Sequence, residues 1–168
     1  MHPFGHNDLK GVTYETLHVN PLQGNVPNNM AKTKKREIGD KGEEVVCKYL
    51  EGKGYRIIER NYWKPWGEID IVAENGSVLS FIEVKSVSRD FKTFNISRET
   101  GIGEGKYKMR PEENMHPAKI KRLHRAIQTY LLDHKVPEDK AWQLDLACAF
   151  LDFSTKKAKV KMLENVIL

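Results

Sequence analysis

The sequence predicts an α/β domain in which a mixed central β-sheet is flanked by helices. Apolar residues recur at helical spacing in residues 37–53 and 117–134, and at strand spacing in the segments between and after them. The order is helix, strand, hairpin, long connection, helix and two strands, which is typical of helices packed on a sheet. The 168 residues are enough for one domain with a proper core and too few to expect two.

Residues 1–36 are expected to be a disordered basic arm ahead of a single domain over residues 37–168. Their apolar residues follow no period, and the segment ends in the basic run Lys32-Thr33-Lys34-Lys35-Arg36. Such a run can contact nucleic-acid phosphates, but a solvated tail is the preferred interpretation. Met30, followed by Ala31 and lysines, resembles a translation start, so residues 1–29 are a candidate upstream extension.

The first helix is predicted over residues 37–53, where apolar positions share one stripe and glycines follow as a stop signal. At about 100° per residue, Glu44 points away from this stripe, whereas Glu43 lies at its edge. Glu43 can therefore face a site under the helix or remain a rim residue without a task. The stripe consists of Ile38, Gly42, Val45, Val46, Tyr49 and Leu50.

Residues 55–62 are predicted to form the first strand, because Ile57 and Ile58 lie between aromatic residues. The chain then passes through two tryptophans, Trp63 and Trp66, to the next strand. These side chains could stack on unpaired bases, line a substrate groove, or pack at the edge of the core.

The centre of the chain predicts a β-hairpin with Asn75-Gly76 as its two-residue loop. That loop would place Glu68 opposite Glu83. Asp70 would then lie diagonal to Glu83, about 7–8 Å away at the backbone. The hairpin spans residues 67–85, and one face carries Glu68, Asp70, Val72, Leu79, Phe81, Glu83 and Lys85.

The acids on this face need an explanation, because carboxylates placed together repel one another and the opposite face is almost wholly apolar. Asp70 and Glu83 could close around one oxygen-seeking ion such as Mg²⁺. Lys85, on the same face, could orient an attacking water or neutralise charge on a phosphate. The alternative interpretation is a solvated face with cross-strand ion pairs.

Asp70 followed, after twelve residues, by Glu83-Val84-Lys85 resembles the D…(D/E)-x-K signature of the PD-(D/E)XK nuclease superfamily. The longer strings Gly67-Glu68-Ile69-Asp70 and Phe81-Ile82-Glu83-Val84-Lys85 resemble the YraN-type family of predicted bacterial endonucleases. The resemblance covers about residues 37–150. Further matching positions are Gly39, Gly42-Glu43, Gly54-Tyr55, Arg60-Asn61, and Lys119 ahead of Leu123.

This resemblance implies a restriction-endonuclease-like core and a divalent-metal-dependent endonuclease that hydrolyses phosphodiester bonds of DNA, structured or branched DNA included. The catalytic residues would be Asp70, Glu83 and Lys85, with Glu43 joining the acids. Mg²⁺ or Mn²⁺ would be held by Asp70, Glu83 and the Val84 backbone, with Glu68 as a further acid. The alternatives are a noncatalytic nucleic-acid-binding protein on a nuclease fold and an adaptor for another protein.

Basic residues downstream of the hairpin are the expected DNA contacts, and the net charge of +5 suits a polyanionic partner. The irregular connection over residues 86–115 follows the acid face directly, as functional loops often do. Pro117 opens the second helix, whose outer face is basic, although solubility alone explains such a face. The candidate contacts are Arg89, Lys92, Arg98, Lys106, Lys108, Arg110, Lys119, Lys121 and Arg122.

Two closing strands are predicted at residues 142–150 and 160–163, with the last strand at an edge of the sheet. Cys47 and Cys148 lie far apart without metal-ligand spacing, so both are expected to be buried, reduced thiols. No apolar run reaches the length of a membrane span and no signal-peptide pattern occurs, which predicts a cytoplasmic protein without a membrane partner. The sequence leaves the oligomeric state open, a dimer included.

Overall fold

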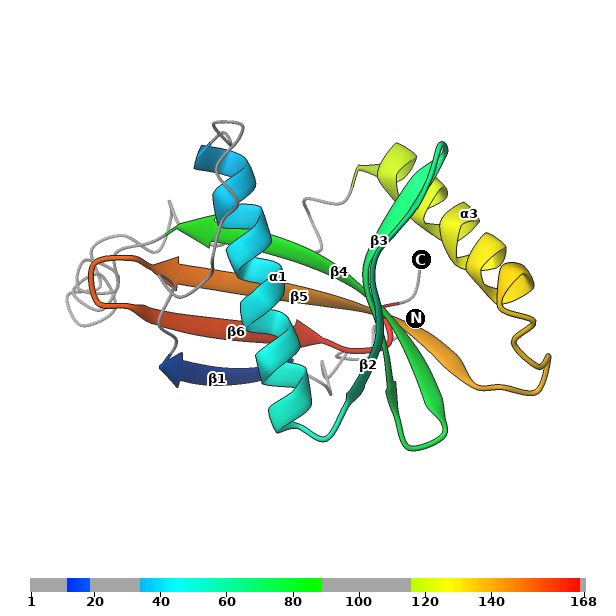
Figure 1. Ribbon diagram of the computed structural model, residues 1–168, viewed down its shortest axis with the longest axis horizontal. Helices are drawn as coiled ribbons and strands as arrows, with labels where there is room; N and C mark the ends of the chain where they lie inside the picture. Colours follow the sequence, from blue (N-terminus) through cyan, green and yellow to red (C-terminus); the bar gives the residue numbers. More distant parts are fainter. Residues whose placement is uncertain (1–11, 19–33, 89–115, 167–168) are drawn as a thin grey trace, which may run out of the picture.

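The computed structural model describes residues 12–18, 34–88 and 116–166, and within them six strands form one mixed sheet (Figure 1). The strand order is β1-β6-β5-β4-β3-β2. Only β4 and β5 are parallel neighbours among these strands. The strands are β1 (Val12–His18), β2 (Arg56–Lys64), β3 (Gly67–Asn75), β4 (Val78–Ser88), β5 (Trp142–Asp152) and β6 (Lys157–Leu163).

Helices α1 (Lys34–Gly52) and α3 (Pro117–Asp133) pack on opposite faces of this sheet. Successive side chains of β4 point to opposite faces of the sheet: Ile82 belongs to the core under α1 and Phe81 to the core under α3. In Figure 1, α1 crosses the middle of the sheet and α3 lies at the end where β2 and β3 rise. The predicted class, a mixed sheet flanked by helices, is confirmed.

Helix α1 buries the stripe expected from its sequence, including Val45, Val46 and Leu50. It begins at Lys34, three residues earlier than predicted. After the helix, Gly54 adopts φ +86°, a left-handed conformation that glycine enters without steric cost.

The β3–β4 hairpin forms, but its loop is Gly76-Ser77 rather than Asn75-Gly76. Asn75 pairs with Val78, and Gly76 takes φ +59° at the first loop position, where primed turns favour glycine. Each β3 residue therefore pairs with a β4 residue two positions further along than predicted. Because side chains alternate with a period of two, the same side chains still share a face. Continued to the acids, this register places Asp70 across from Glu83 instead of diagonal to it.

Strands β3 and β4 separate where the acids lie. Their pairing extends only to Ile71 and Ile82, while β3 continues to pair with β2 as far as Gly67. The first half of β3 thus leaves the sheet with β2 and extends toward α3, which makes a fork between β3 and β4 (Figure 1). Ile69, in the departing half, consequently joins the core under α3 rather than the core under α1.

The prediction of a disordered arm is wrong for residues 12–18, which form β1 and pair antiparallel with β6. Strand β6 is therefore not at the edge, as expected, but lies between β5 and β1. The segment escaped prediction because its apolar residues, Val12, Tyr14 and Leu17, alternate only between the first two, which is too short a pattern to indicate a strand.

The remaining elements agree with their sequence signals. Helix α3 begins at Pro117, and the His116 side chain accepts a hydrogen bond from the Ala118 N–H at 3.2 Å. Both cysteines are buried and unbridged. Across the described ranges, no helix has the length and apolar character needed to cross a membrane.

Candidate active site

The candidate site lies in the fork between β3 and β4. Because β3 has left β4 at this point, the Val84 N–H donates to the side chain of Asp70, with 2.7 Å between N and Oδ2. This bond directs the Asp70 carboxylate into the fork, toward the strand that carries Glu83. The predicted gathering of Asp70, Glu83 and Lys85 is what the structure contains, although the register that achieves it differs from the expected one.

Glu83 is the most buried acid of this group, with a side-chain exposure of 1%. Its Oε1 contacts two ammonium groups: Lys85 Nζ at 3.3 Å, and Lys119 Nζ, which reaches it from α3. Its Oε2 is buried and has no hydrogen-bond partner within the described part of the chain. A buried carboxylate oxygen left open in this way is uncommon, because desolvation without a partner is costly.

The Glu83 carboxylate affects the ionisation of Asp70. Burial, together with the neighbouring charge of Glu83, raises the pKa of Asp70 to about 7, and the Val84 N–H opposes this rise only in part. On the cationic side, burial works against the charge of Lys119, yet the Glu83 carboxylate raises the pKa of Lys119 above its ordinary value. The fork therefore concentrates negative charge that would be relieved by a further cation.

Glu43 approaches the fork from α1. It is half-buried, its Oε2 lies 3.6 Å from Arg60 Nη2 on β2, and Asn61 bonds its carboxylate. Burial raises the pKa of Glu43, and its charge adds to the rise at Asp70. The sequence left open whether Glu43 faces the site or lies at a rim; in the structure its side-chain partners are Arg60 and Asn61 of β2, and its charge acts on Asp70. Glu44 pairs on the surface instead, with Lys41 and Lys48.

Two glycines bring these elements close together. A Cβ on Gly42 of α1 would overlap the Ser86 side chain on β4, and a Cβ on Gly67 of β3 would lie 2.5 Å from the Arg122 carbonyl oxygen on α3. Each glycine directly precedes an acid, Glu43 or Glu68, so the close approach sets where that acid lies. Both belong to the strings on which the family resemblance was based.

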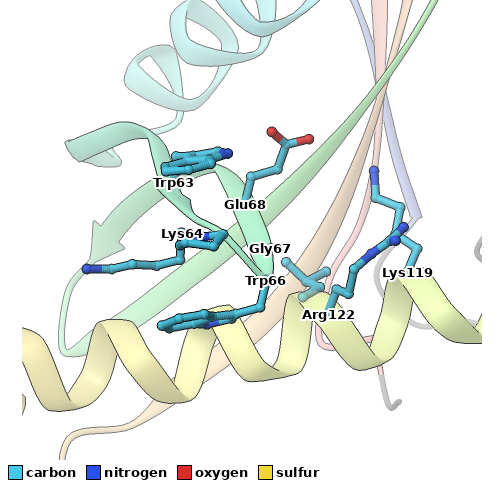
Figure 2. A pocket seen from close by; sticks show the side chains of 9 residues that line it. Trp63, Lys64, Trp66, Gly67, Glu68, Lys119 and Arg122 are labelled. Carbon is cyan, nitrogen blue, oxygen red and sulfur yellow. The ribbon is translucent and has the colours of Figure 1, made fainter.

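Glu68 does not join Asp70 and Glu83. It is exposed and lines an adjacent pocket of about 250 Å³ between the β2–β3 turn and α3 (Figure 2). Lys119 lines the same pocket and also contacts Glu83, so pocket and fork are contiguous. The lining residues are Trp63, Lys64, Pro65, Trp66, Gly67, Glu68, Lys119, Arg122 and Leu123.

The predicted nucleic-acid contacts divide into three groups. Lys121 and Arg122 are exposed on α3, as expected. Lys119 is instead partly buried against Glu83. Helical spacing could not reveal this contact, but the place of Lys119 among the family motif positions could have suggested it. Six others lie outside the described residues: Arg89, Lys92, Arg98, Lys106, Lys108 and Arg110.

Two other buried acids serve the fold and contrast with Glu83. Asp145 accepts hydrogen bonds from the Asn165 N–H at 2.8 Å and from the Gln143 amide. Asp152 accepts from the Ser154 backbone and hydroxyl in the turn between β5 and β6. Within the described part of the chain, the two other buried acids are thus hydrogen-bonded, and the open oxygen of Glu83 is a feature of the fork.

The donor set in the fork fits a small hard cation. No group of three His, Cys, Asp or Glu side chains within the described ranges is arranged to hold a metal ion. Mg²⁺, however, commonly takes only one or two carboxylates, with water and substrate phosphates completing its shell. Asp70 and Glu83 supply those two carboxylates, and Oε2 of Glu83 is free to bind.

Fold and fork together define a mixed α/β protein with a restriction-endonuclease-like core. The model of the uncharacterised protein family UPF0102 matches residues 42–150, and the chain belongs to this family, which confirms the resemblance noted from its motifs. The UPF0102 protein of Campylobacter lari is 34% identical over 129 residues, covering 77% of this chain and 92% of the relative. That of Helicobacter hepaticus is 34% identical over 133 residues, covering 79% and 96%. That of Chlorobaculum parvum is 42% identical over 94 residues, covering 56% and 60%.

Proposed function

We propose that the protein is a divalent-metal-dependent endonuclease that hydrolyses phosphodiester bonds of DNA, with structured or branched DNA as the candidate substrate class. The observation that carries the proposal is the pair of carboxylates in the fork: Glu83 is buried, has an open oxygen and contacts two lysines, and Asp70 is half-buried beside it. A carboxyl group whose pKa is strongly raised by burial and a neighbouring charge, as that of Asp70 is, is typical of functional sites. Their position matches the superfamily signature quoted above.

Mg²⁺ or Mn²⁺ would be held by Asp70, Glu83 and the backbone of Val84. When bound, the ion would lower the pKa of a water molecule and stabilise negative charge on the phosphate. The chain's own groups would do the rest. Lys85, 3.3 Å from Glu83, would orient the attacking water, and Lys119 would offset phosphate charge from the α3 side.

Exposed cations on α3 would bind the DNA backbone. Lys121 and Arg122 lie on the helix that carries Lys119, so a strand held there would pass the fork. The basic residues of the connection after β4 lie outside the described residues and are further candidate DNA contacts by sequence alone. A noncatalytic DNA-binding protein would need such cations too, but it has no evident use for the open oxygen of Glu83.

The test is cleavage of a panel of linear, single-stranded, flapped and four-way-junction DNA in Mg²⁺ or Mn²⁺. Asp70→Asn should abolish cleavage and leave DNA affinity unchanged or slightly higher, because removing a negative charge eases the approach of phosphate. Asp139→Asn, at an exposed turn residue, is the matched control and should cleave like the wild type. A wild type that cuts nothing in the panel and takes up no Mn²⁺ would favour the noncatalytic binding protein.

A further inference from the structure

The pocket beside the fork combines aromatic and cationic walls. Trp63 and Trp66 come from the end of the β2–β3 hairpin, and Arg122 and Lys119 come from α3 (Figure 2). Trp63 is 66% exposed although it lies within strand β2 and pairs with Glu68 of β3. An indole left this open is unusual for core or rim packing, because it forgoes most of the burial that large aromatic side chains otherwise obtain.

Contacts between the hairpin end and α3 hold this pocket in shape. The Trp66 Nε1–H donates to Thr129 Oγ1 at 3.2 Å, and the Arg125 guanidinium lies 4.8 Å from the centre of the Trp66 ring. Lys64 pairs with Asp133 at 2.7 Å. Together with the close approach of Gly67 to α3, these contacts pre-form the site, so a ligand need not order it.

The volume and the location restrict the ligand. At about 250 Å³, the pocket is smaller than the roughly 300–1,000 Å³ of sites that bury drug-sized ligands, so a single ring system suits it. Bases within a duplex keep their faces stacked on one another, whereas an unpaired base offers a face to an indole. Arg122 and Lys119 can hold the adjoining phosphates, and the Glu68 carboxylate can accept from an exocyclic amino group.

We propose that this pocket binds an unpaired base of a DNA strand, with Trp63 as the stacking platform, and that the phosphodiester next to that base is presented to the fork. This inference rests on the proposed function, because DNA is taken as the substrate, and it adds which kind of DNA the site would prefer. The preferred substrate would carry a single-stranded segment or a displaced base at the cleavage point. A continuous duplex would occupy the cations and leave the pocket unused.

The experiment measures binding with a chelator present, so that no cleavage occurs. The probes are a short single-stranded oligonucleotide, an abasic strand of the same length and charge, and a duplex. The wild type should bind the base-containing strand more tightly than the abasic one and show quenching of tryptophan fluorescence. Trp63→Ala should weaken single-strand binding about 5- to 150-fold, the range measured for lost base stacking, and leave abasic and duplex binding unchanged.

Two further variants keep this test specific. Trp63→Phe should retain most of the single-strand affinity, because a smaller ring still stacks. Phe153→Ala removes another exposed aromatic, in the β5–β6 turn at the far end of the sheet, and should change nothing (Figure 1). Equal affinity for abasic and base-containing strands, or an unaltered Trp63→Ala variant, would overturn the inference. Neither result depends on cleavage, so a failure here is distinct from a failure of the nuclease proposal.

Discussion

Asp70 illustrates how one residue can be held in an unfavourable state by its neighbours. Its carboxylate is half-buried beside Glu83, and a single backbone N–H provides only part of the stabilisation that water would give. Unfavourable arrangements of this kind are typical of functional sites, whereas the buried acids Asp145 and Asp152 each accept several hydrogen bonds. A cation in the fork would remove this cost.

The raised pKa of Asp70 predicts how stability depends on pH without metal. The folded-state value of about 7 exceeds the ordinary 3.8, so the unfolded chain loses its proton first, and stability falls as pH rises from about 4 to about 7. Asp70→Asn removes this contribution and should be more stable than the wild type at pH 8, by on the order of 2 kcal/mol. Urea unfolding in chelator at pH 5 and pH 8 measures the difference.

The gain in the free energy of unfolding caused by Asp70→Asn should be smaller at pH 5 than at pH 8, because at pH 5 Asp70 is still mostly protonated in the folded wild type. Asp139→Asn should show neither effect. An advantage of the Asn variant that shrinks as pH rises would contradict the prediction. Adding Mn²⁺ should stabilise the wild type and not the variant, since ligands that bind only the folded state raise its stability.

Lys85 is predicted to matter for rate more than for binding. It sits 3.3 Å from Glu83 within the fork, so Lys85→Ala should lower cleavage about 10²–10³-fold, as loss of a donor that acts in the transition state does, with little change in DNA affinity. Lys48→Ala, which breaks a surface pair with Glu44, is the control and should cleave normally. A Lys85→Ala loss seen only in affinity would assign this lysine to substrate binding instead. Single-turnover cleavage alongside a binding titration separates the two.

At the scale of elements, the position of α1 depends on Gly42. Because a Cβ there would overlap Ser86 on β4, Gly42→Ala should push the helix away from the sheet, costing about 1–3 kcal/mol and displacing Glu43. Gly39→Ala is the matched control in the same helix, since a Cβ there meets nothing within 4 Å. It should gain up to about 1 kcal/mol from helix propensity. Thermal unfolding of both variants checks the opposite signs, and equal shifts would refute the close-packing argument.

At the scale of the whole molecule, the distribution of charge predicts salt-dependent DNA binding. The chain carries +5, and exposed cations on α3 lie next to the fork. Each phosphate contact releases counterions, so log affinity should fall linearly with log salt. Lys121→Ala should reduce that slope by about 1. Lys157→Ala, at the start of β6 and the opposite end of the sheet, should leave it unchanged (Figure 1). Salt-insensitive binding would argue for a protein partner instead of DNA.

The sequence by itself determined the local elements and the parity of the hairpin. Helical spacing identified the buried face of α1, and Pro117 identified the start of α3. Because strand side chains alternate with a period of two, a loop misplaced by one residue still left Asp70, Glu83 and Lys85 on one side. The family motifs then singled out these positions as a site.

Only the tertiary structure decided which groups the acids contact. Three contacts join residues that are distant in the chain. Asp70 turns toward Glu83 in the fork, and the Lys119 ammonium contacts Glu83. Glu68 lines the pocket beside Trp63 and so lies apart from the other acids. The β1–β6 pairing is likewise made by backbone groups. Such contacts depend on how strands diverge and how closely helices approach, and neither property leaves a period in the sequence.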